Sequence, residues 1–230
     1  MLAIRTLKRT TLNTNNKPKK PRRLLSAAVK DTMETNNTHT FFALMNRMKH
    51  ITRWSLMRTN IREDLMQHSA CVAIFGQALA IIRNEMFGGN VDVDKVASLA
   101  LYHDTAEVLS GDMPTPVKYY NDAMKSAYAE IEDVINVKII NSLPEELRLS
   151  YADYLQPDVS TEEYKLMKVA DKLSAYVKSL EEKHVGNHDF DKAFITLGNS
   201  IDKLKEEYPE LKYFVDNFLD GFAEPIDTLL

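Results

Sequence analysis

The sequence is poor in residues that break helices. It contains seven glycines and eight prolines in 230 residues, and two of the prolines, Pro18 and Pro21, precede Met33. In a helix interior, glycine costs about 1 kcal/mol and proline about 3 kcal/mol relative to alanine. The remainder of the chain therefore favours helices, and it contains no alternating strand pattern and no internal repeat.

Cysteine and long apolar runs are also scarce. The one cysteine, Cys71, cannot form an intramolecular disulfide, so a reducing, cytoplasmic compartment is the simplest interpretation. Cys71 opens the most apolar run, CVAIFGQALAII, whose 12 residues fall short of the roughly 20 that span a bilayer. The sequence therefore predicts no transmembrane helix and no membrane partner.

Acidic side chains are almost missing from the first 32 residues. This segment has nine Lys and Arg residues and one acid, Asp31, so it carries a charge of +8, while the rest of the chain carries −12. Its stretch KPKKPRR could contact nucleic acid or anionic lipid, or belong to a transit peptide. The alternatives are a disordered extension, or an upstream misreading of the start, because Met33 directly precedes the first patterned segment. The acidic remainder argues against a nucleic-acid polymer as the main ligand.

Apolar periodicity and capping signals predict one all-α domain over residues 38–230, preceded by a basic, disordered extension over residues 1–37. Ser160 with Glu163 has the pattern of a capping box, and Thr115 with Pro116 has that of an N-cap followed by a first helical residue. No linker divides the body. The predicted helices span about 40–50, 64–86, 92–110, 116–142, 145–155, 161–183, 189–206 and 209–222.

The second, third and sixth of these helices each carry ionisable groups among apolar neighbours: His68, then His103 and Asp104, then Asp171. A lone histidine on an apolar face is more often a hydrogen-bonded core residue, and Asp171 alone could pair with a neighbouring lysine such as Lys168. Together, two imidazoles and two carboxylates make a sufficient ligand set for one divalent ion, which would remove the cost of burying the charges.

The His103-Asp104 dipeptide is weak evidence on its own. A second pair, His188-Asp189, occurs in the polar stretch GNHDFD, which we interpret as surface. Adjacent residues on a helix point about 100° apart, whereas His103 and Glu107, at positions i and i+4, share a face. Spacing alone therefore favours Glu107 over Asp104 as a metal ligand.

The order of these candidates on separate helices resembles the HD-domain metal-dependent phosphohydrolases, an all-helical superfamily. More narrowly, the bacterial 5′-deoxynucleotidases of that superfamily look similar over about residues 41–183, in RWSLMR, the His68 segment, LYHDTAEVLSGDMPTPVKYY and VADKLSAYVKSLEE. The resemblance implies an HD-domain helical bundle with a metal site between its central helices and a core motif region over about residues 64–183. The basic first 32 residues have no counterpart in it.

The resemblance implies that one divalent metal is bound by His68, His103, Asp104 and Asp171. Nitrogen and carboxylate ligands suit Mn²⁺, Co²⁺ or Fe²⁺ better than an all-oxygen Mg²⁺ site. By the same resemblance, Glu107 becomes the catalytic acidic residue beside the attacking water rather than a ligand.

Two loops are implied to face the substrate. The first contains Arg53 and the chain's only tryptophan, Trp54; a guanidinium can bind a phosphate bidentately, and in the family this arginine orients the 5′-phosphate. The second is GDMPTP, in which Asp112 and the following residues face substrate. Without the resemblance, Asp112 could equally be a turn-forming residue, and Trp54 could be a core aromatic residue. The residues implied to be catalytic are Arg53, Glu107 and Asp112. The residues implied to bind substrate are Arg53, Trp54, His68, Asp104, Asp112, Met113, Pro114, Thr115 and Asp171.

The predicted activity is hydrolysis of 2′-deoxyribonucleoside 5′-monophosphates to deoxynucleosides and phosphate, by a cytoplasmic protein that the resemblance implies to be a homodimer. One alternative is another HD-type nucleotide phosphohydrolase, acting on nucleoside triphosphates or signalling nucleotides. Extra phosphates need further cations, and the candidates near the site are only Arg53, Arg58, Arg62 and Lys118. The other alternative is a non-catalytic nucleotide-sensing module.

Overall fold

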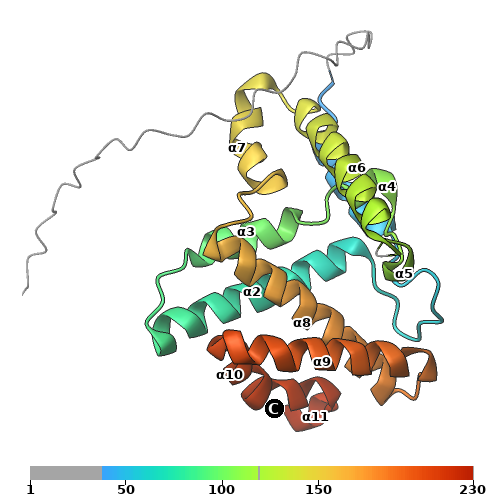
Figure 1. The fold of residues 1–230 in the computed structure, drawn as a ribbon, viewed down its shortest axis with the longest axis vertical. Coiled ribbons are helices and arrows are strands. Elements are labelled where there is room, and N and C mark those ends of the chain that lie inside the picture. Colours follow the sequence, from blue (N-terminus) through green and yellow to red (C-terminus); the bar gives the residue numbers. More distant parts are fainter. Residues whose placement is uncertain (1–37, 119, 230) are drawn as a thin grey trace, which may run out of the picture. The chain divides into compact units, whose positions relative to one another are not determined.

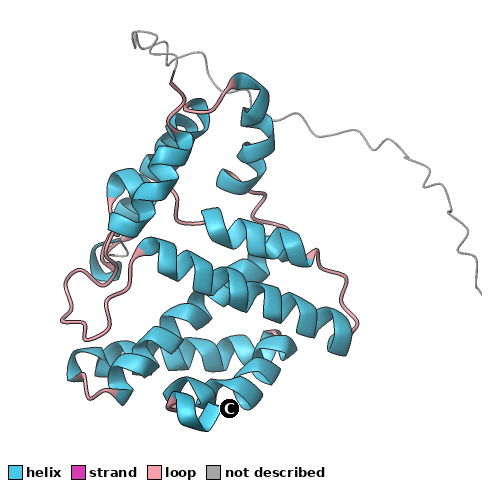
Figure 2. Ribbon diagram, turned by 180° about the vertical axis from the view of Figure 1, so that it is seen from behind, coloured by secondary structure: helices cyan, strands magenta, loops and turns pink. Residues whose placement is uncertain are grey.

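The computed structural model describes residues 38–118 and 120–229; the predicted extension over residues 1–37 lies outside them. Within the described ranges the chain is helical, with one isolated antiparallel bridge between Thr52 and Asp64 and no named strand (Figures 1 and 2). The prediction of an all-α fold is confirmed. In chain order the helices are α1 (Phe41–Met45), η1 (Asn46–His50), α2 (Leu65–Phe87), α3 (Val93–Tyr102), α4 (Glu107–Ser110), α5 (Thr115–Lys118), α6 (Asp122–Asn141), α7 (Glu145–Leu155), α8 (Glu162–His184), η2 (His188–Phe190), α9 (Asp191–Glu207), α10 (Pro209–Phe218), η3 (Leu219–Ala223) and α11 (Ile226–Leu229).

Helix α2 is the central element of the domain. It contacts α3, α8 and α10, and α8 in turn contacts α9 (Figure 1). The stripe of Val72, Phe75, Leu79 and Ile82 is buried against these neighbours, as its helical spacing predicts. The main apolar core therefore lies between the same helices that carry the predicted metal ligands.

The helices approach one another closely at Gly76. A Cβ atom at this position would lie 2.9 Å from Val96 Cγ1 on α3 and 3.6 Å from Ala170 Cβ on α8. Glycine thus allows α2 to meet both helices at one point. Because Ala170 precedes Asp171, and His68 lies about two turns before Gly76, this close packing brings α2 and α8 together beside the site.

A smaller apolar cluster is formed by α1, α6, α7 and the turn before α4. Ala106 belongs to it, directly before Glu107, so the start of α4 is anchored on this cluster. Its buried members are Phe41, Ala106, Ile135, Ile139, Ile140, Leu143 and Leu155.

The 12-residue apolar run is only part of α2, so its length is the wrong reason for excluding a membrane span. By length and composition alone, the 23 residues of α2 could cross a bilayer, and among the described residues α2 is the one helix that meets this test. Half of its most apolar window is buried, against α3, α8 and α10. This is the pattern of a core helix in a globular domain.

Two predicted helices are interrupted in the structure. The helix predicted to end near Ser110 stops at Tyr102, where i→i+3 bonds from Thr105 N to Tyr102 O and from Glu107 N to Asp104 O replace α-helical bonds. Residues 103–106 form turns before α4 begins. The helix predicted over 116–142 is divided into α5 and α6, because the Asn121 side chain accepts a hydrogen bond from Met124 N and starts α6.

The cap of α8 also differs from the prediction. Thr161, not Ser160, is the N-cap, and its Oγ1 accepts a hydrogen bond from Tyr164 N at 3.2 Å. Ser160 Oγ donates instead to Asp158 Oδ1. Glu163 does not close a capping box, since its carboxylate accepts a hydrogen bond from Asp92 N at the start of α3.

Candidate metal centre

Three of the predicted ligands converge where α2, α3 and α8 meet. His68 comes from the first turn of α2, His103 directly follows α3, and Asp171 lies in the middle of α8. One ligand atom from each lies within 4.8 Å of the other two. Asp171 Oδ1 is 3.2 Å from His68 Nε2 and 3.7 Å from His103 Nε2.

Asp104 points toward the same place. Its Oδ2 lies 3.1 Å from His103 Nε2 and 3.7 Å from His68 Nε2. The spacing argument for Glu107 over Asp104 assumed a regular helix through both residues, and that assumption is wrong because α3 ends at Tyr102. In the turns that follow, adjacent side chains can face the same point.

Both imidazoles present a bare nitrogen to these carboxylates. The Nε2 atoms of His68 and His103 are buried and have no hydrogen-bond partner among the described residues. The other ring nitrogen of His103, Nδ1, is 2.7 Å from the Ala100 carbonyl oxygen, which can only accept, so Nδ1 donates and Nε2 carries the lone pair of the neutral ring. The Nδ1 of His68 lies 3.2 Å from Ser174 Oγ.

The cluster favours a positive charge at its centre. Burial opposes charge on His103, but the carboxylates of Asp104 and Asp171 outweigh it and raise the pKa of His103 to about 10. Burial lowers the pKa of His68, which keeps this imidazole neutral, as a metal ligand must be. Two buried, unpartnered imidazole nitrogens facing two carboxylates are a donor set that fits a divalent cation.

Lys168 fixes the orientation of Asp171. Its Nζ donates to Asp171 Oδ2 at 2.6 Å, which leaves Oδ1 facing the imidazoles. Burial opposes ionisation of Asp171, but Lys168 and the two histidines outweigh it and hold the pKa of Asp171 well below its ordinary value. The ion pair between Lys168 and Asp171, the alternative to a metal site, is therefore present. It uses Oδ2, not the oxygen that faces the imidazoles.

Glu107 is buried one turn beyond the cluster. Its Oε2 is buried and has no hydrogen-bond partner among the described residues. Burial, together with the charges of Asp104 and Asp112, raises the pKa of Glu107 to about 9. A carboxyl group that holds a proton near neutral pH can act as a general acid or base.

Arg53 and Trp54 lie beside this cluster, held by acidic side chains. Arg53 Nη1 is 3.5 Å from Asp104 Oδ2, and Arg53 Nε donates to Glu63 Oε2 at 3.2 Å. The same Glu63 oxygen accepts from Trp54 Nε1 at 2.9 Å, and Asp112 Oδ2 accepts from Trp54 N at 3.2 Å. No sequence pattern points to Glu63, because a loop residue has no periodicity that would reveal its partner.

A cavity of about 630 Å³ adjoins Arg53 and Trp54. It contains most of the residues predicted to bind substrate, but none of the four predicted metal ligands. Another wall comes from η2 and α9, which carry no site residue predicted from the sequence. The lining residues are Arg53, Trp54, Ser55, Leu56, Met57, Asp112, Met113, Pro114, Thr115, Pro116, Asp189, Lys192, Ala193, Thr196 and Leu197.

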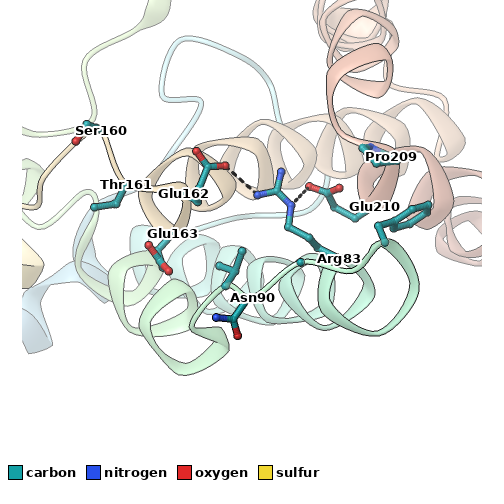
Figure 3. Close-up of a pocket in the computed structure, with 11 residues that line it drawn as sticks. Arg83, Asn90, Ser160, Thr161, Glu162, Glu163, Pro209 and Glu210 are labelled. Atoms are coloured by element: carbon teal, nitrogen blue, oxygen red, sulfur yellow. Dashed lines mark hydrogen bonds and ion pairs between the residues drawn. The ribbon is translucent and has the colours of Figure 1, made fainter. Parts of the chain in front are cut away.

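A second cavity of about 680 Å³ contains no predicted site residue. It lies between the C-terminal end of α2 and the starts of α8 and α10. Arg83 crosses it, with Nε donating to Glu210 Oε1 at 2.9 Å and Nη1 to Glu162 Oε2 at 3.1 Å (Figure 3). The Glu210 side chain is fully buried. This cavity holds a structural ion pair at the opposite end of α2 from His68.

The second histidine-aspartate pair lies outside the metal cluster. His188 is exposed and pairs with Asp191 at 3.0 Å, in keeping with the surface interpretation. Asp189 holds the guanidinium of Arg58 with bonds of 2.9 and 2.8 Å.

An all-helical domain with this cluster between its central helices is of the HD-domain phosphohydrolase class. The structure resembles an HD-domain phosphohydrolase from Listeria innocua with a TM-score of 0.72 and 25% identity, over 81% of this chain and 90% of that one. It shares its fold with the cyanophage S-2L HD phosphohydrolase DatZ, solved with dA and one catalytic Zn²⁺ ion, at a TM-score of 0.55 and 20% identity over 83% and 98% of the two chains.

Within that class the sequence is more specific. The family model described as 5′-deoxynucleotidase YfbR-like matches residues 40–222. Curated relatives include a 5′-deoxynucleotidase of Photobacterium profundum, 41% identical over 82% of this chain and 97% of the relative, and 5′-deoxynucleotidase YfbR of Escherichia coli, 42% identical over 82% and 94%. The chain belongs to the YfbR-like 5′-deoxynucleotidase family.

Proposed function

We propose that the protein is a metal-dependent phosphomonoesterase that hydrolyses 2′-deoxyribonucleoside 5′-monophosphates to deoxynucleosides and phosphate. The observation that carries the proposal is the pair of unpartnered Nε2 atoms of His68 and His103, which face two carboxylates beside Arg53. Membership of the family and the names of the relatives support the substrate class.

His68, His103, Asp104 and Asp171 would hold the metal. A divalent ion bound there supplies a Lewis acid for the phosphoryl group and lowers the pKa of water. We propose Mn²⁺, Co²⁺ or Fe²⁺, and nitrogen and carboxylate donors also accept Zn²⁺.

Arg53 would bind the phosphate. Its Nε is held by Glu63, which orients the planar guanidinium, and Nη1 reaches toward Asp104 at the edge of the cluster. A guanidinium so oriented can bind two phosphate oxygens and compensate their charge. Asp112 keeps the neighbouring backbone in place through Trp54 N and borders the cavity at this point.

Glu107 would move the proton. In the reaction a water oxygen forms a bond to phosphorus, the bond from phosphorus to O5′ breaks, and O5′ needs a proton. We assign Glu107 to give its proton to O5′ and to take one from the attacking water in return, because its buried carboxyl holds a proton near neutral pH.

The cations that the sequence offers for extra phosphates favour a single phosphate at the cluster; Lys192, on α9, lines the cavity as well. Arg58 is paired with Asp189 and Lys118 with Glu132, so both cations already have carboxylate partners. Arg62 Nη2 donates to Thr52 Oγ1. Of the cations considered for extra phosphates, only Arg53 faces the cluster, which supports a monophosphate over a triphosphate.

We also propose that residues 38–230 form a single catalytic domain, and that the protein is a cytoplasmic homodimer without nucleic-acid or membrane partners. Cys71 is a free, exposed thiol, consistent with a reducing compartment.

Light scattering coupled to gel filtration would measure the mass of the proposed dimer. A mass of one chain at all concentrations would contradict the dimer.

A panel of three substrates tests the proposed activity. Phosphate release from dAMP, AMP and dATP is measured with Mn²⁺, Co²⁺ or Zn²⁺. We expect release from dAMP, much less from AMP, and none from dATP. Equal turnover of dAMP and AMP would contradict the deoxyribose assignment, and preferred turnover of dATP would favour the triphosphohydrolase alternative.

A further inference from the structure

The segment of residues 55–62, here called the outer loop, extends from the site to the end of α8. Its ends are joined by the backbone bond from Arg53 N to Glu63 O at 3.1 Å and by the bridge between Thr52 and Asp64. Arg53 and Trp54 thus lie at the base of a loop whose outer part is held by other elements.

Glu182, near the C-terminal end of α8, holds the backbone of the outer loop. Its carboxylate accepts hydrogen bonds from Asn60 N and Ile61 N, both at 2.9 Å. It also accepts from Lys178 Nζ at 2.6 Å and from Asn187 Nδ2 at 2.8 Å. Lys178 Nζ donates in addition to the Ile61 carbonyl oxygen. Both oxygens of one carboxylate are therefore fully used by the loop and its neighbours.

This ion pair is buried where an apolar pair could have been packed. The side chain of Glu182 is 0% exposed and that of Lys178 is 4% exposed. Burying an ion pair gives little or no net stability compared with well-packed apolar residues. What the pair does supply is an acceptor for two loop N–H groups and a donor for one loop carbonyl, so its effect is to define the loop backbone.

Residues after α8 hold the same loop at a second point. Asp189 accepts from Arg58 N at 3.3 Å as well as from the Arg58 guanidinium. Asn187 Nδ2 donates to Arg58 O at 2.6 Å. The segment after α8, which looked like plain surface, is tied to the loop through both backbone and side chain.

The base of the loop needs such support because its backbone is strained. Trp54 has a φ of 58°, the left-handed region that bulky residues rarely adopt. Strain of this kind persists only where the surroundings determine the conformation. The Trp54 ring packs on Phe190, with centroids 5.2 Å apart, and Phe190 directly follows Asp189.

From these contacts we propose that Glu182 is a positioning residue for the substrate site. Glu182 fixes the outer loop through the N–H groups of Asn60 and Ile61. As a result, Trp54 keeps its strained backbone conformation and the Arg53 guanidinium stays directed toward the cluster. The expected effect of Glu182 on kinetics rests on the proposed function, whereas its effect on the conformation of Trp54 does not.

The test compares Glu182→Gln with Glu210→Gln. An amide has one acceptor oxygen where the carboxylate has two, so Glu182→Gln leaves some of its four donors unpaired without changing the shape. Glu210 is a matched control, because it is also 0% exposed and paired with a cation, and it lies in the cavity at the far end of α2. Trp54 is the only tryptophan, so its fluorescence reports on the loop directly.

In the metal-loaded full-length protein, we expect Glu182→Gln to increase acrylamide quenching of Trp54. It should also raise KM for dAMP about tenfold with little change in kcat, since Arg53 binds the phosphate before and during the reaction. Glu210→Gln should change the melting temperature only. If Glu182→Gln does not fold, Asp189→Asn, which loosens the same loop from its exposed side, should change quenching and KM in the same direction.

Unchanged quenching and KM in folded Glu182→Gln, or in folded Asp189→Asn, would overturn the proposal. Equal changes in Glu182→Gln and Glu210→Gln would also overturn it, because they would reflect general loosening. If the wild type hydrolyses no deoxynucleotide, the proposed function fails, and the quenching comparison still decides the role of Glu182.

Discussion

His68 Nε2 lies 3.2 Å from Asp171 Oδ1 where α2 contacts α8, and this nitrogen has no hydrogen-bond partner among the described residues. Either a proton on the imidazole or a bound cation must therefore compensate the Asp171 carboxylate at this distance, and a divalent ion would compensate both carboxylates of the cluster at once. The folded state should therefore bind a divalent metal far better than the unfolded state.

Metal binding is thus expected to stabilise the fold. At a concentration about 100 times its Kd, an ion bound only by the folded state adds about 2.7 kcal/mol, or roughly 5 to 10 °C in melting temperature. Differential scanning fluorimetry of chelator-treated protein with Mn²⁺, Co²⁺ or Zn²⁺ measures this. His68→Ala should lose the shift, while His188→Ala, an exposed histidine of the second pair, should keep it. Equal shifts in both variants would place the metal elsewhere.

Glu107→Gln should separate activity from stability. The amide cannot carry the proton, so turnover of dAMP should fall at least about 100-fold. The raised pKa of Glu107 means that ionisation costs stability as pH rises from its ordinary value toward about 9, and an amide avoids this cost. Urea unfolding of chelator-treated protein at pH 8 should find the variant at least as stable as wild type. A marked loss of stability would show that the ionised carboxylate is needed structurally.

Gly76→Ala should destabilise the junction of α2 with α3 and α8. The new Cβ would lie 2.9 Å from Val96 Cγ1, so a helix must shift at a cost of about 1 to 3 kcal/mol. Gly198→Ala is the control, since this glycine also lies within a helix and its Cβ would meet Tyr176 at 3.4 Å. Thermal unfolding of both variants decides the point. Similar melting temperatures for the two would mean that the close approach at Gly76 is easily relieved.

Glu182 should make the fold sensitive to acid. Burial opposes its ionisation, but the bonds from Lys178, Asn187 and the backbone of Asn60 and Ile61 outweigh it and lower the pKa of Glu182 to about 2. Because the folded pKa is depressed, the stabilisation is complete above the ordinary value of about 4.5 and is lost as pH falls toward about 2. Its size is at most about 3.5 kcal/mol.

The measurement is the difference in unfolding free energy between wild type and Glu182→Gln, taken on chelator-treated protein from pH 7 to pH 3. Taking the difference removes the effects of the other carboxylates. We expect the difference to be constant above about pH 5 and to shrink below it. A difference that stays the same down to pH 3 would contradict the depressed pKa.

Local periodicity in the sequence accounts for much of the fold. His68 is buried with Val72 and Phe75 because α2 keeps a regular 3.6-residue period from its cap at Asp64 onward. The orientation of Asp104 could not be predicted in this way, since it depends on where α3 ends, and apolar periodicity continues past that point into α4.

The contacts that support the site are the least visible in sequence. Glu63 meets Trp54 across a loop, and Glu182 meets Ile61 from the far end of α8. Neither contact follows a helical or strand period, because each depends on how the tertiary fold brings distant segments of the chain together. The α9 wall of the cavity, including Lys192 and Thr196, was missed for the same reason.

The most direct test of the central claim is the metal dependence of dAMP hydrolysis at this one cluster. Phosphate release is measured for chelator-treated wild type and Asp171→Asn, before and after addition of Mn²⁺, Co²⁺ or Zn²⁺. We predict no release before metal, release by the wild type once a metal is added, and at least about 100-fold less from Asp171→Asn. Full activity in the chelator-treated wild type, or equal activity of Asp171→Asn, would contradict a metal centre built by His68, His103, Asp104 and Asp171.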